Sequence, residues 1–570
     1  MSASVALAIG TRASALATAQ ATILRDALGA IGVEARIVPI TTDGDLRAPD
    51  TAWGEGAFVT AIERALIEWR IDLAIHSAKD LPTDEDPRLT IAAYLPREDP
   101  RDALVVAAAS GSDDVRALDL ASLPMGARVG TDSPRRSAFL LARRPDLRVH
   151  PIHGNVDTRL RRLDDGETDA LVLATAGLNR LGLARRIASH LEPSSIPPAP
   201  GQGALAVQAR TDDVRARDLV SRLDDRPTRR AVELERAILA RSGGGCRAPL
   251  GALAVVDGQG IAVTAGYARA GGGLAITTTH RAPGGRDVGL AAAVVDELAR
   301  RATLAAMASG APRVLVTRAA DQSAATALAL VDRGLAPRIV PCIAIVFEPS
   351  DPLDTAITSL AGPAHVDWVV FTSANAVRSL SAAADRLGVD LTAARPAGPR
   401  WAAIGRATAA AMREAGIRVD LQPARADGRD LAASLPIVPG VRVLLPRGDL
   451  ADGSLPTALA DRGAVVTTVV AYRTDEAPAA SIPLLAAALA ESPVAIVATS
   501  GSTVRGLLAL TTAIGAEDHV RAIPVVAIGP GTAAEASRLG FAVAGHAPMQ
   551  GPGGIADAVA AAVFSSAAVR

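Results

Sequence analysis

The segment Asp72-Leu-Ala-Ile-His-Ser-Ala-Lys-Asp80-Leu-Pro82 runs from an apolar, strand-like stretch into a polar cluster that ends at a proline. Sites in α/β folds collect at the carboxyl ends of strands, so we expect Lys79 and Asp80 to emerge where a site can form. The alternative for Asp80 is a structural ion pair with a neighbouring cation.

Short β-type runs alternate with Ala/Leu-rich stretches of helical period along the rest of the chain, and this interleaving is typical of α/β layers. Helix starts carry capping signals: Thr131-Asp132-Ser133-Pro134 places a hydroxyl before a proline at the first helical position. The β-type runs that we single out are Val5–Ile9, Leu104–Val106, Leu171–Leu173 and Val314–Val316.

Size and charge narrow the class of protein. The chain has 570 residues and a mass of 58.0 kDa, which at ~150 residues per domain suggests about four units. Apolar residues make up 49%, and 60 acidic side chains nearly balance 59 basic ones. This composition excludes a disordered chain and a coat for polyanions, so we expect no nucleic-acid partner.

Two cysteines, Cys246 and Cys342, are too few for a disulfide framework or a multi-cysteine metal site, so we expect no metal and a reducing compartment. The N-terminus lacks the features of an export signal, and no apolar run approaches the ~18 residues of a membrane helix. We therefore expect a cytoplasmic protein without membrane contact, and a monomer.

Two proline-rich segments, Pro96–Pro100 and Pro193–Pro200, are candidate hinges at which the chain would cross between two lobes that enclose a cleft. The small-residue stretch Ala308–Pro312 marks a further boundary. The predicted units before that boundary are a lobe of residues 1–97 plus 198–215, a lobe of residues 101–192, and a small α+β domain of residues 218–306.

Beyond residue 312 the chain repeats itself. Arg313-Val-Leu-Val-Thr-Arg318 recurs as Arg442-Val-Leu-Leu-Pro-Arg447, and Ile404-Gly405 with Thr408 recurs as Ile528-Gly529 with Thr532. We expect a bilobal α/β unit with parallel sheets over residues 312–566. Its two lobes would be residues 312–346 plus 476–566, and residues 350–472.

Four loops in this repeated part lie where a strand should end and a helix begin, so their free N–H groups would suit anionic groups in a cleft between the lobes. The alternative is that their glycines and hydroxyls only form tight turns and caps. The loops are Thr372–Asn375, Gly405–Thr408, Ser500–Thr503 and Gly529–Thr532.

Cys246 follows three glycines and lies three residues before Pro249. A lone cysteine is often a small buried side chain, but this setting describes a flexible loop that presents its thiol. A thiol that carries a group covalently and a thiol nucleophile both fit. Arginines at loop and helix-start positions suit a ligand with many carboxylates, with solvated surface charge as the alternative: Arg12, Arg135, Arg136, Arg159 and Arg180.

Residues 4–305 resemble hydroxymethylbilane synthase (porphobilinogen deaminase). The matching stretches are GTRASALA, HSAKDLP, REDPRDALV, VGTDSPRRSAFL, HGNVDTRLRRL, TDALVLATAGLNRLGL, PAPGQGALAV and GGGCRAPLG. The resemblance implies two lobes like those of periplasmic binding proteins plus the small domain. It also implies that four porphobilinogens are polymerised to hydroxymethylbilane, with loss of ammonia, on a dipyrromethane cofactor bound through Cys246.

The resemblance also assigns roles to residues. It makes Asp80 the catalytic acid, and it gives the many arginines a reason, because every pyrrole brings two carboxylates. The residues implied to hold the cofactor are Cys246, Lys79, Thr131, Ser133, Arg135 and Arg136. Those implied to hold substrate are Arg12, Ser14, Ser77, His153, Asn155, Arg159 and Arg180.

Three positions depart from the usual family pattern: Glu55 and Thr60 stand where lysines are common, and His153 stands where arginine is usual. Each change removes or inverts a positive charge near a polyanionic substrate, so the first activity could be slower, pH-dependent through His153, or lost. Two further interpretations stay open for residues 4–305, namely an anion-binding module for transport or sensing and a degenerate scaffold.

Residues 312–566 resemble uroporphyrinogen-III synthase through VLVTR, DWVVFTSANAV, AIGRATAAAM, VVAYRT and VVAIGPGTAA. The resemblance implies cyclisation of hydroxymethylbilane to uroporphyrinogen III with inversion of its last ring. It makes Tyr472 the candidate proton donor, although a tyrosine at a strand end can also be structural. The residues implied to hold the carboxylates are Thr372, Ser373, Thr408, Ser500, Ser502 and Thr532.

Overall fold

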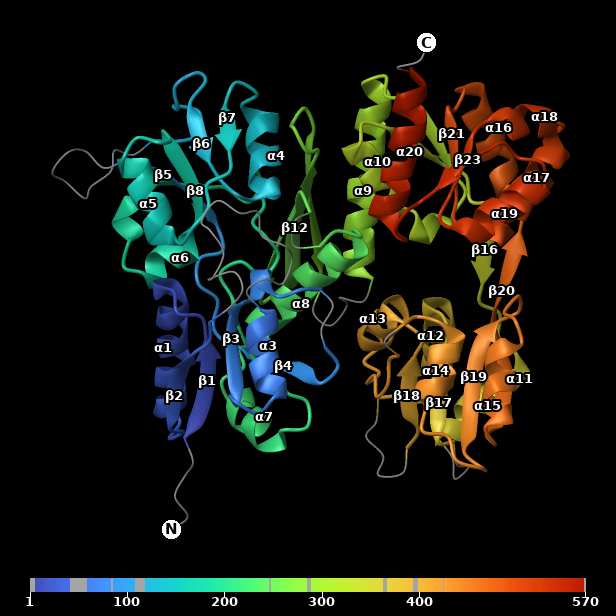
Figure 1. Cartoon of the computed structure of the whole chain (residues 1–570), viewed down its shortest axis with the longest axis horizontal. Helices are drawn as coiled ribbons and strands as arrows, with labels where there is room; N and C mark the ends of the chain where they lie inside the picture. The colour runs from blue at the N-terminus through green and yellow to red at the C-terminus, as the bar shows by residue number, and fades with distance from the viewer. Residues whose placement is uncertain are drawn as a thin grey trace.

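The computed structural model describes residues 6–41, 59–83, 86–107, 118–245, 248–283, 289–361, 366–392, 398–423 and 425–567. These residues form five sheets with helices interleaved, which confirms the predicted α/β fold. In Figure 1 the elements up to α8 and β12 occupy one side of the molecule and those from α10 onward the other. Val5, Glu55 and Cys246 lie outside the described residues.

The first lobe is a mixed sheet in the order β2-β1-β3-β10-β4, in which β10 is antiparallel to both of its neighbours. Apolar side chains of α1 and α7 pack on one face and those of α3 on the other. Its elements are β1 (Leu7–Thr11), α1 (Ala15–Ala30), β2 (Ala35–Pro39), α3 (Thr60–Ile67), β3 (Leu73–Ser77), β4 (Leu89–Tyr94), β10 (Leu205–Arg210) and α7 (Val214–Ser221). This lobe thus extends through α7, beyond the expected end at residue 215.

The second lobe repeats this order as β7-β6-β8-β5-β9, with β5 as the antiparallel strand. Helix α4 covers one face, and α5 and α6 cover the other. Its elements are β5 (Asp102–Val106), β6 (Arg128–Gly130), α4 (Pro134–Arg143), β7 (Arg148–His150), α5 (Val156–Asp164), β8 (Ala170–Ala174), α6 (Thr175–Arg180) and β9 (Ile187–Leu191). The chain crosses from the first lobe to the second between β4 and β5 and returns between β9 and β10, where the proline-rich segments lie.

The small domain is an antiparallel sheet of three strands packed against two helices. Its elements are α8 (Arg226–Arg241), β11 (Leu250–Asp257), β12 (Gly260–Ala268), β13 (Ala275–Ala282) and α9 (Leu290–Ala308). Its core does not stop at Ala308, because Leu328 and Val331 of helix α10 (Ala324–Asp332) belong to the same buried cluster. The small domain and the next lobe therefore share one hydrophobic core.

The third and fourth lobes each contain parallel strands, β15-β14-β21-β22-β23 and β20-β19-β17-β18. The third lobe comprises β14 (Arg313–Val316), α10, β15 (Ala336–Ile339), α16 (Ile482–Ala490), β21 (Ala495–Ala498), α17 (Gly501–Ile514), α18 (Glu517–Ala522), β22 (Val525–Ala527), α19 (Pro530–Arg538), β23 (Val543–His546) and α20 (Pro552–Ala567). The fourth comprises α11 (Asp351–Ala361), β17 (Trp368–Phe371), α12 (Ala374–Leu387), β18 (Arg400–Ala403), α13 (Arg406–Glu414), α14 (Gly428–Ser434), β19 (Arg442–Gly448), α15 (Ser454–Asp461) and β20 (Val465–Glu476).

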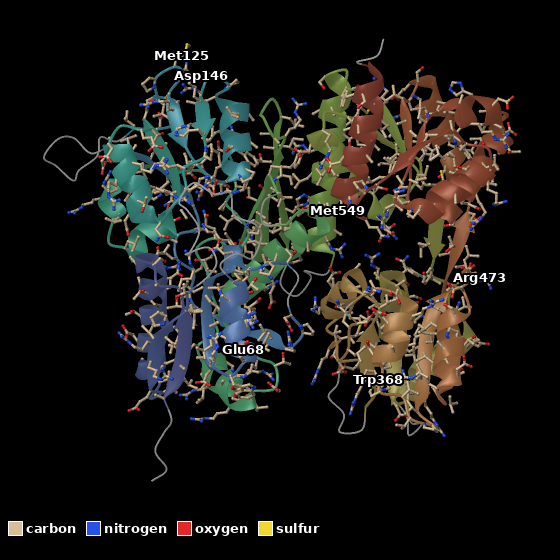
Figure 2. The ribbon with its side chains drawn as sticks, viewed as in Figure 1. Glu68, Met125, Asp146, Trp368, Arg473 and Met549 are labelled. Atoms are coloured by element: carbon tan, nitrogen blue, oxygen red, sulfur yellow. The ribbon has the colours of Figure 1, made fainter. Side chains whose placement is uncertain are left out.

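The sequence repeat is exchanged between these two lobes. The repeated strands β14 and β19 lie in different lobes, and each lobe takes its next two central strands from the other repeat. The lobes are joined by β16 (Ile343–Val346), which pairs antiparallel with the end of β20. Figure 1 shows this ribbon between the lobes, and Arg473 marks it in Figure 2. Since β20 is continuous through Glu476, no boundary falls at residue 472.

None of the helices in the described ranges combines the length and the apolar character needed to cross a membrane.

Candidate functional sites

The polar cluster at 77–80 lies where the sequence predicts it. Strand β3 ends at Ser77, and residues Ala78–Asp80 form a single 3-10 turn before the chain becomes extended again at Leu81. Ala78 is fully buried, whereas Lys79 is half-buried and Asp80 is exposed. The turn thus directs two charged side chains away from the core of the first lobe.

A cavity of about 330 Å³ lies between the first and second lobes, and both charged side chains line it. Ten of the predicted site residues belong to its lining, five from each lobe. They are Arg12, Ser14, Ser77, Lys79, Asp80, Arg136, His153, Asn155, Arg159 and Arg180. The structure therefore brings together cations and hydroxyls that lie up to 168 positions apart, between Arg12 and Arg180.

Lys79 donates a hydrogen bond from Nζ to Oε1 of Gln202 at 3.1 Å. Desolvation lowers its pKa to about 8, and the positive charge of Arg136 acts in the same direction, while Asp80 and Asp102 oppose the shift. An ammonium ion at this place is therefore held in a poorly solvated site, where a bound carboxylate would gain most from it.

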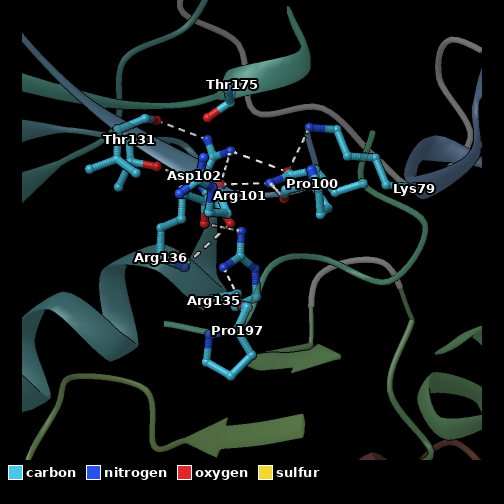
Figure 3. Close-up of polar contacts among 12 residues, drawn as sticks. Lys79, Pro100, Arg101, Asp102, Thr131, Arg135, Arg136, Thr175 and Pro197 are labelled. Atoms are coloured by element: carbon cyan, nitrogen blue, oxygen red, sulfur yellow. Dashed lines mark hydrogen bonds and ion pairs between the residues drawn. The ribbon is translucent and has the colours of Figure 1, made fainter. Parts of the chain in front are cut away.

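Arg135 and Arg136 are buried around a single carboxylate, that of Asp102 (Figure 3). Oδ1 of Asp102 accepts from Arg136 Nη2 at 2.7 Å and from Gln202 Nε2 at 2.9 Å, and Oδ2 lies 2.8 Å from Arg135 Nη2. Arg135 also donates to the carbonyl of Pro197. Burial opposes ionisation of Asp102, but both guanidinium groups outweigh it and hold the pKa of the carboxyl well below its usual range.

The two arginines of this network differ in position. Arg136 reaches the cavity, whereas Arg135 is not among the cavity's lining residues in the described part of the chain. Thr131 and Ser133 are likewise not among them and act locally: Ser133 caps α4 by accepting from the N–H of Arg136, and Thr131 Oγ1 accepts from the N–H of Ser133.

Two of the remaining cavity arginines, Arg159 and Arg180, come from the second lobe, whereas Arg12 follows β1 of the first lobe. Arg159 donates to the carbonyl of Gly154, and desolvation lowers its pKa, as does the charge of Arg136. Arg180 donates to the carbonyl of Gly203 at 2.6 Å, and desolvation lowers its pKa to about 10 against the attraction of Glu98. Both guanidinium groups are thus poorly hydrated and face a cavity that could supply anionic partners.

His153 and Thr60 are the two unusual positions that can be described. His153 Nδ1 lies 3.2 Å from Oδ1 of Asp132, and both side chains line the cavity. Thr60 begins helix α3. A carboxylate therefore lies beside the imidazole of His153 in the cavity.

The glycine-rich segment follows helix α8. Ser242 Oγ accepts from the N–H of Gly244 and donates to the carbonyl of Leu239. Beyond the two undescribed positions, the N–H of Ala248 donates to the carbonyl of Gly245 at 3.0 Å. The prediction for Cys246 concerns a residue outside the described part of the chain.

Gln202 and Asp102 connect Lys79 to the arginines, and neither residue was predicted from the sequence. Both were inside stretches used for the family resemblance, PAPGQGALAV and REDPRDALV. In the structure Gln202 is 1% exposed and Asp102 is 0% exposed, and buried polar side chains such as these require partners. Their burial would have identified them as functional candidates, but a sequence does not show burial.

In the third and fourth lobes, the predicted hydroxyls stand at helix N-termini. Ser373 caps α12 by accepting from the N–H of Ala376, and Ser500 caps α17 in a reciprocal pair with Thr503. Ser500 and Ser502 share a hydrogen bond of 2.8 Å. Thr372 directly follows β17, and Thr408 and Thr532 lie in the first turns of α13 and α19.

These helix starts follow β17, β18, β21 and β22, and the two lobes touch at the first of them. Gln322 Nε2 donates to Asn375 Oδ1 at 3.4 Å, and Arg378 lies 3.6 Å from Asp321. Near this contact, desolvation lowers the pKa of Arg318 against the opposing charge of Asp321. Helix N-termini and a poorly solvated guanidinium suit carboxylates.

Tyr472 stands on β20, where this strand leaves the fourth lobe. Its half-buried ring lies against Gly448: a Cβ at Gly448 would come within 2.7 Å of Tyr472 Cζ and 2.8 Å of its Oη. The N–H of Asp449 donates to its carbonyl. Glycine at 448 thus leaves the space that the phenol ring occupies.

The two sets of residues differ in what they offer to a ligand with several carboxylates. The first offers an acid, an ammonium ion and guanidinium groups in one cavity, and the donor set matches a pyrrole chain that carries carboxylates on every ring. The second offers hydroxyls and N–H groups but, among the described predicted residues, only Tyr472 could exchange a proton.

Comparisons with known proteins agree with this chemistry. Residues 7–218 match the family model of porphobilinogen deaminase, dipyromethane cofactor binding domain, and residues 324–556 match that of uroporphyrinogen-III synthase HemD. The chain is 48% identical over 297 residues to the porphobilinogen deaminase of Roseiflexus sp. (strain RS-1), covering 51% of this chain and 95% of that protein.

Two further comparisons add to these matches. The porphobilinogen deaminase of Mycobacterium ulcerans is 51% identical over 249 residues, which are 44% of this chain and 77% of that protein. A mutant uroporphyrinogen III synthase from Thermus thermophilus is 22% identical with a TM-score of 0.33, covering 45% of this chain and all of that chain.

Proposed function

Because the chain belongs to the porphobilinogen deaminase family and carries a uroporphyrinogen-III synthase domain behind it, we propose that one polypeptide converts porphobilinogen to uroporphyrinogen III. The two activities follow from the family matches. The roles of individual residues are our proposal, and one observation carries it: Asp80 and Lys79 leave a strand end together and face guanidinium groups of the other lobe across one cavity.

In the deaminase part, Asp80 stabilises the positive charge that develops as porphobilinogen loses ammonia, because a carboxylate held at the end of β3 needs little reorganisation when that charge appears. Lys79 and Arg136 hold cofactor carboxylates, with Arg135, Thr131 and Ser133 supporting them through α4 and Asp102. Arg12, Ser14, Ser77, His153, Asn155, Arg159 and Arg180 hold the carboxylates of incoming and growing substrate.

The dipyrromethane cofactor, attached to Cys246, supplies the pyrrole end from which the chain grows. The residues present fit such a group, because the cations Lys79 and Arg136 both line the cavity and desolvation strengthens the interaction of Lys79 with an anion. Gln202 orients both of them through its amide oxygen, at 3.1 Å from Lys79 and 3.4 Å from Arg136.

In the synthase part, positioning is the main contribution. Thr372, Ser373, Thr408, Ser500, Ser502 and Thr532, together with the N–H groups of their helices, hold the carboxylates of hydroxymethylbilane. Tyr472 donates a proton to the departing hydroxyl. No metal is needed for either step in this scheme.

We assign the deaminase to residues 1–97 plus 198–221, 101–192 and the small domain at 226–308, and the synthase to residues 312–566. The low cysteine count supports a cytoplasmic location, and we propose a monomer. Its partners are small molecules, porphobilinogen and hydroxymethylbilane.

Intact mass and ammonia release test the proposal. We expect the purified chain to carry an adduct of about two pyrrole units, absent from Cys246→Ser, and we expect Asp80→Asn to lower ammonia release by about 10²-fold or more. Asp132→Asn, which changes another cavity carboxylate, is the matched control and should act far less. A bare polypeptide mass, or ammonia release unaffected by Asp80→Asn, contradicts the assignment and favours a binding module or an inactive scaffold.

A further inference from the structure

We call the glycine-rich segment from Gly243 to Cys246 the arm, and its first residues the root of the arm. We propose that the synthase domain holds this root, so that residues of the second enzyme position the cofactor of the first. The proposal rests on Cys246 as the attachment site, as proposed above. It concerns the described residues on either side of that cysteine, and it makes deaminase turnover depend on Pro552, Ala325 and Glu414.

The base of the arm is continuous with the synthase domain. Leu328, Val331 and Ala336 of the third lobe lie in the buried core of the small domain. Tyr267, which is 3% exposed, donates from its hydroxyl to the carbonyl of Leu328, and Asp332 Oδ1 accepts from the N–H of Ala270 at 2.9 Å. A shared close-packed core moves as one body.

The first residue of the arm touches the third lobe. Gly243 follows the C-cap of α8 with a φ of +70°, and a Cβ at this position would lie 2.9 Å from Pro552 Cγ and 3.0 Å from Ala325 Cβ. Residues with a side chain rarely adopt this backbone conformation, and the two contacts leave no space for a Cβ. Glycine is thus required here for two reasons, of which the second comes from the synthase domain.

The last residue of α8 contacts the fourth lobe. Arg241 Nη2 lies 2.7 Å from Oε2 of Glu414 at the end of α13. Earlier in α8, the fully buried carboxylate of Glu235 accepts hydrogen bonds from Arg97 Nη1 at 2.7 Å and from the N–H of Gly201 at 2.6 Å. Arg97 and Gly201 lie where the chain crosses between the first two lobes. Helix α8 therefore runs from the deaminase hinge to both synthase lobes (Figure 1).

Such a fixed root has a physical consequence for chain growth. Three successive glycines precede Cys246, and glycine allows many backbone conformations. Every conformation that places the attached group away from Asp80 lowers the effective concentration of that group at Asp80. Contacts that fix Gly243 and Arg241 reduce this number at the place where the arm begins. The synthase domain thereby favours productive placement.

The test compares Gly243→Ala with Gly310→Ala in the full-length chain. Gly310 also follows a helix, α9, with a φ of +75°, but no described atom lies within 4 Å of its added Cβ. Both variants carry the same backbone strain, and only Gly243→Ala displaces the arm from Pro552 and Ala325. We expect about tenfold faster amide hydrogen exchange over residues 242–250 and about tenfold lower deaminase kcat in Gly243→Ala alone.

Two compensating variants separate positioning from a general loss of folding. Pro552→Ala together with Ala325→Gly removes both atoms that lie nearest to a new Cβ, so adding this pair to Gly243→Ala should restore slow exchange and most of kcat. Arg241→Glu should loosen the arm, and the exchanged pair Arg241→Glu with Glu414→Arg should tighten it again. Synthase turnover of supplied hydroxymethylbilane should stay unchanged in Arg241→Glu.

Equal exchange and equal kcat in Gly243→Ala and Gly310→Ala overturn the proposal, as does failure of both compensating variants to restore slow exchange. If Gly243→Ala does not fold, the Arg241/Glu414 exchange decides by itself. The adduct mass of the unaltered chain is measured alongside: its absence contradicts the function proposed above, whereas exchange over residues 242–250 still reports on the arm.

Discussion

The guanidinium group of Arg136 lies 2.7 Å from the carboxylate of Asp102, and both are buried between the hinge and helix α4. Asp102→Asn would leave Arg135 and Arg136 without their shared countercharge. We expect a loss of ~3–5 kcal/mol of unfolding free energy, measured as the urea dependence of deaminase activity. Asp26→Asn, which breaks an exposed pair with Arg25, should cost ~0.5 kcal/mol or less. Equal effects of the two variants would show that the buried network does not stabilise the fold.

The first activity should depend on pH through Lys79. Desolvation lowers the pKa of Lys79 to about 8, so its positive charge is present below that pH and is lost as the pH rises through it. We expect deaminase kcat to fall above pH 8, because a neutral amine no longer holds the cofactor carboxylate in place. Lys79→Arg keeps its charge over this range and should flatten the profile; the same fall in that variant would place the titration elsewhere.

Tyr472→Phe separates the proposed proton donor from a structural ring. The phenyl group still fills the space beside Gly448, so stability should change by ~1 kcal/mol or less, while cyclisation of supplied hydroxymethylbilane should slow by about 10²-fold. Deaminase turnover is the internal control and should not change. Full cyclisation activity in this variant, with an unaltered ratio of uroporphyrinogen III to isomer I, would make Tyr472 structural.

The shared core predicts that one synthase substitution weakens both enzymes. Leu328 is buried among residues of the small domain, and Leu328→Ala should cost ~2–5 kcal/mol and lower the temperature at which deaminase activity is lost. Leu380, equally apolar and buried in the fourth lobe, is the matched control. Leu380→Ala should lower the heat stability of synthase activity only, and a drop in both activities there would mean that all lobes unfold together.

Much of the fold follows from local sequence. Period and capping residues predicted α/β layers, a strand that ends before Lys79 and Asp80, and the start of α4 after Ser133, and the structure confirms each of these. The repeat beyond residue 312 predicted two similar lobes. These features depend on residues a few positions apart, whose backbone preferences act without help from the rest of the chain.

The fate of individual polar side chains could not be predicted in the same way. Arg135 and Arg136 are neighbours in sequence, yet only Arg136 lines the cavity, and Gln202 carried no signal beyond its place in a motif. Burial and pairing decide such roles, and both depend on segments about 34 to 100 residues away, such as Asp102.

Local patterns were sufficient to predict the layers, the helix starts, and the order of two enzymes along one chain. The shared core across Ala308–Pro312 and the contact of α8 with Glu414 could be found only from the packed molecule. Hydrophobic burial is non-directional, so an apolar pattern predicts that Leu328 will be covered but does not predict which surface covers it.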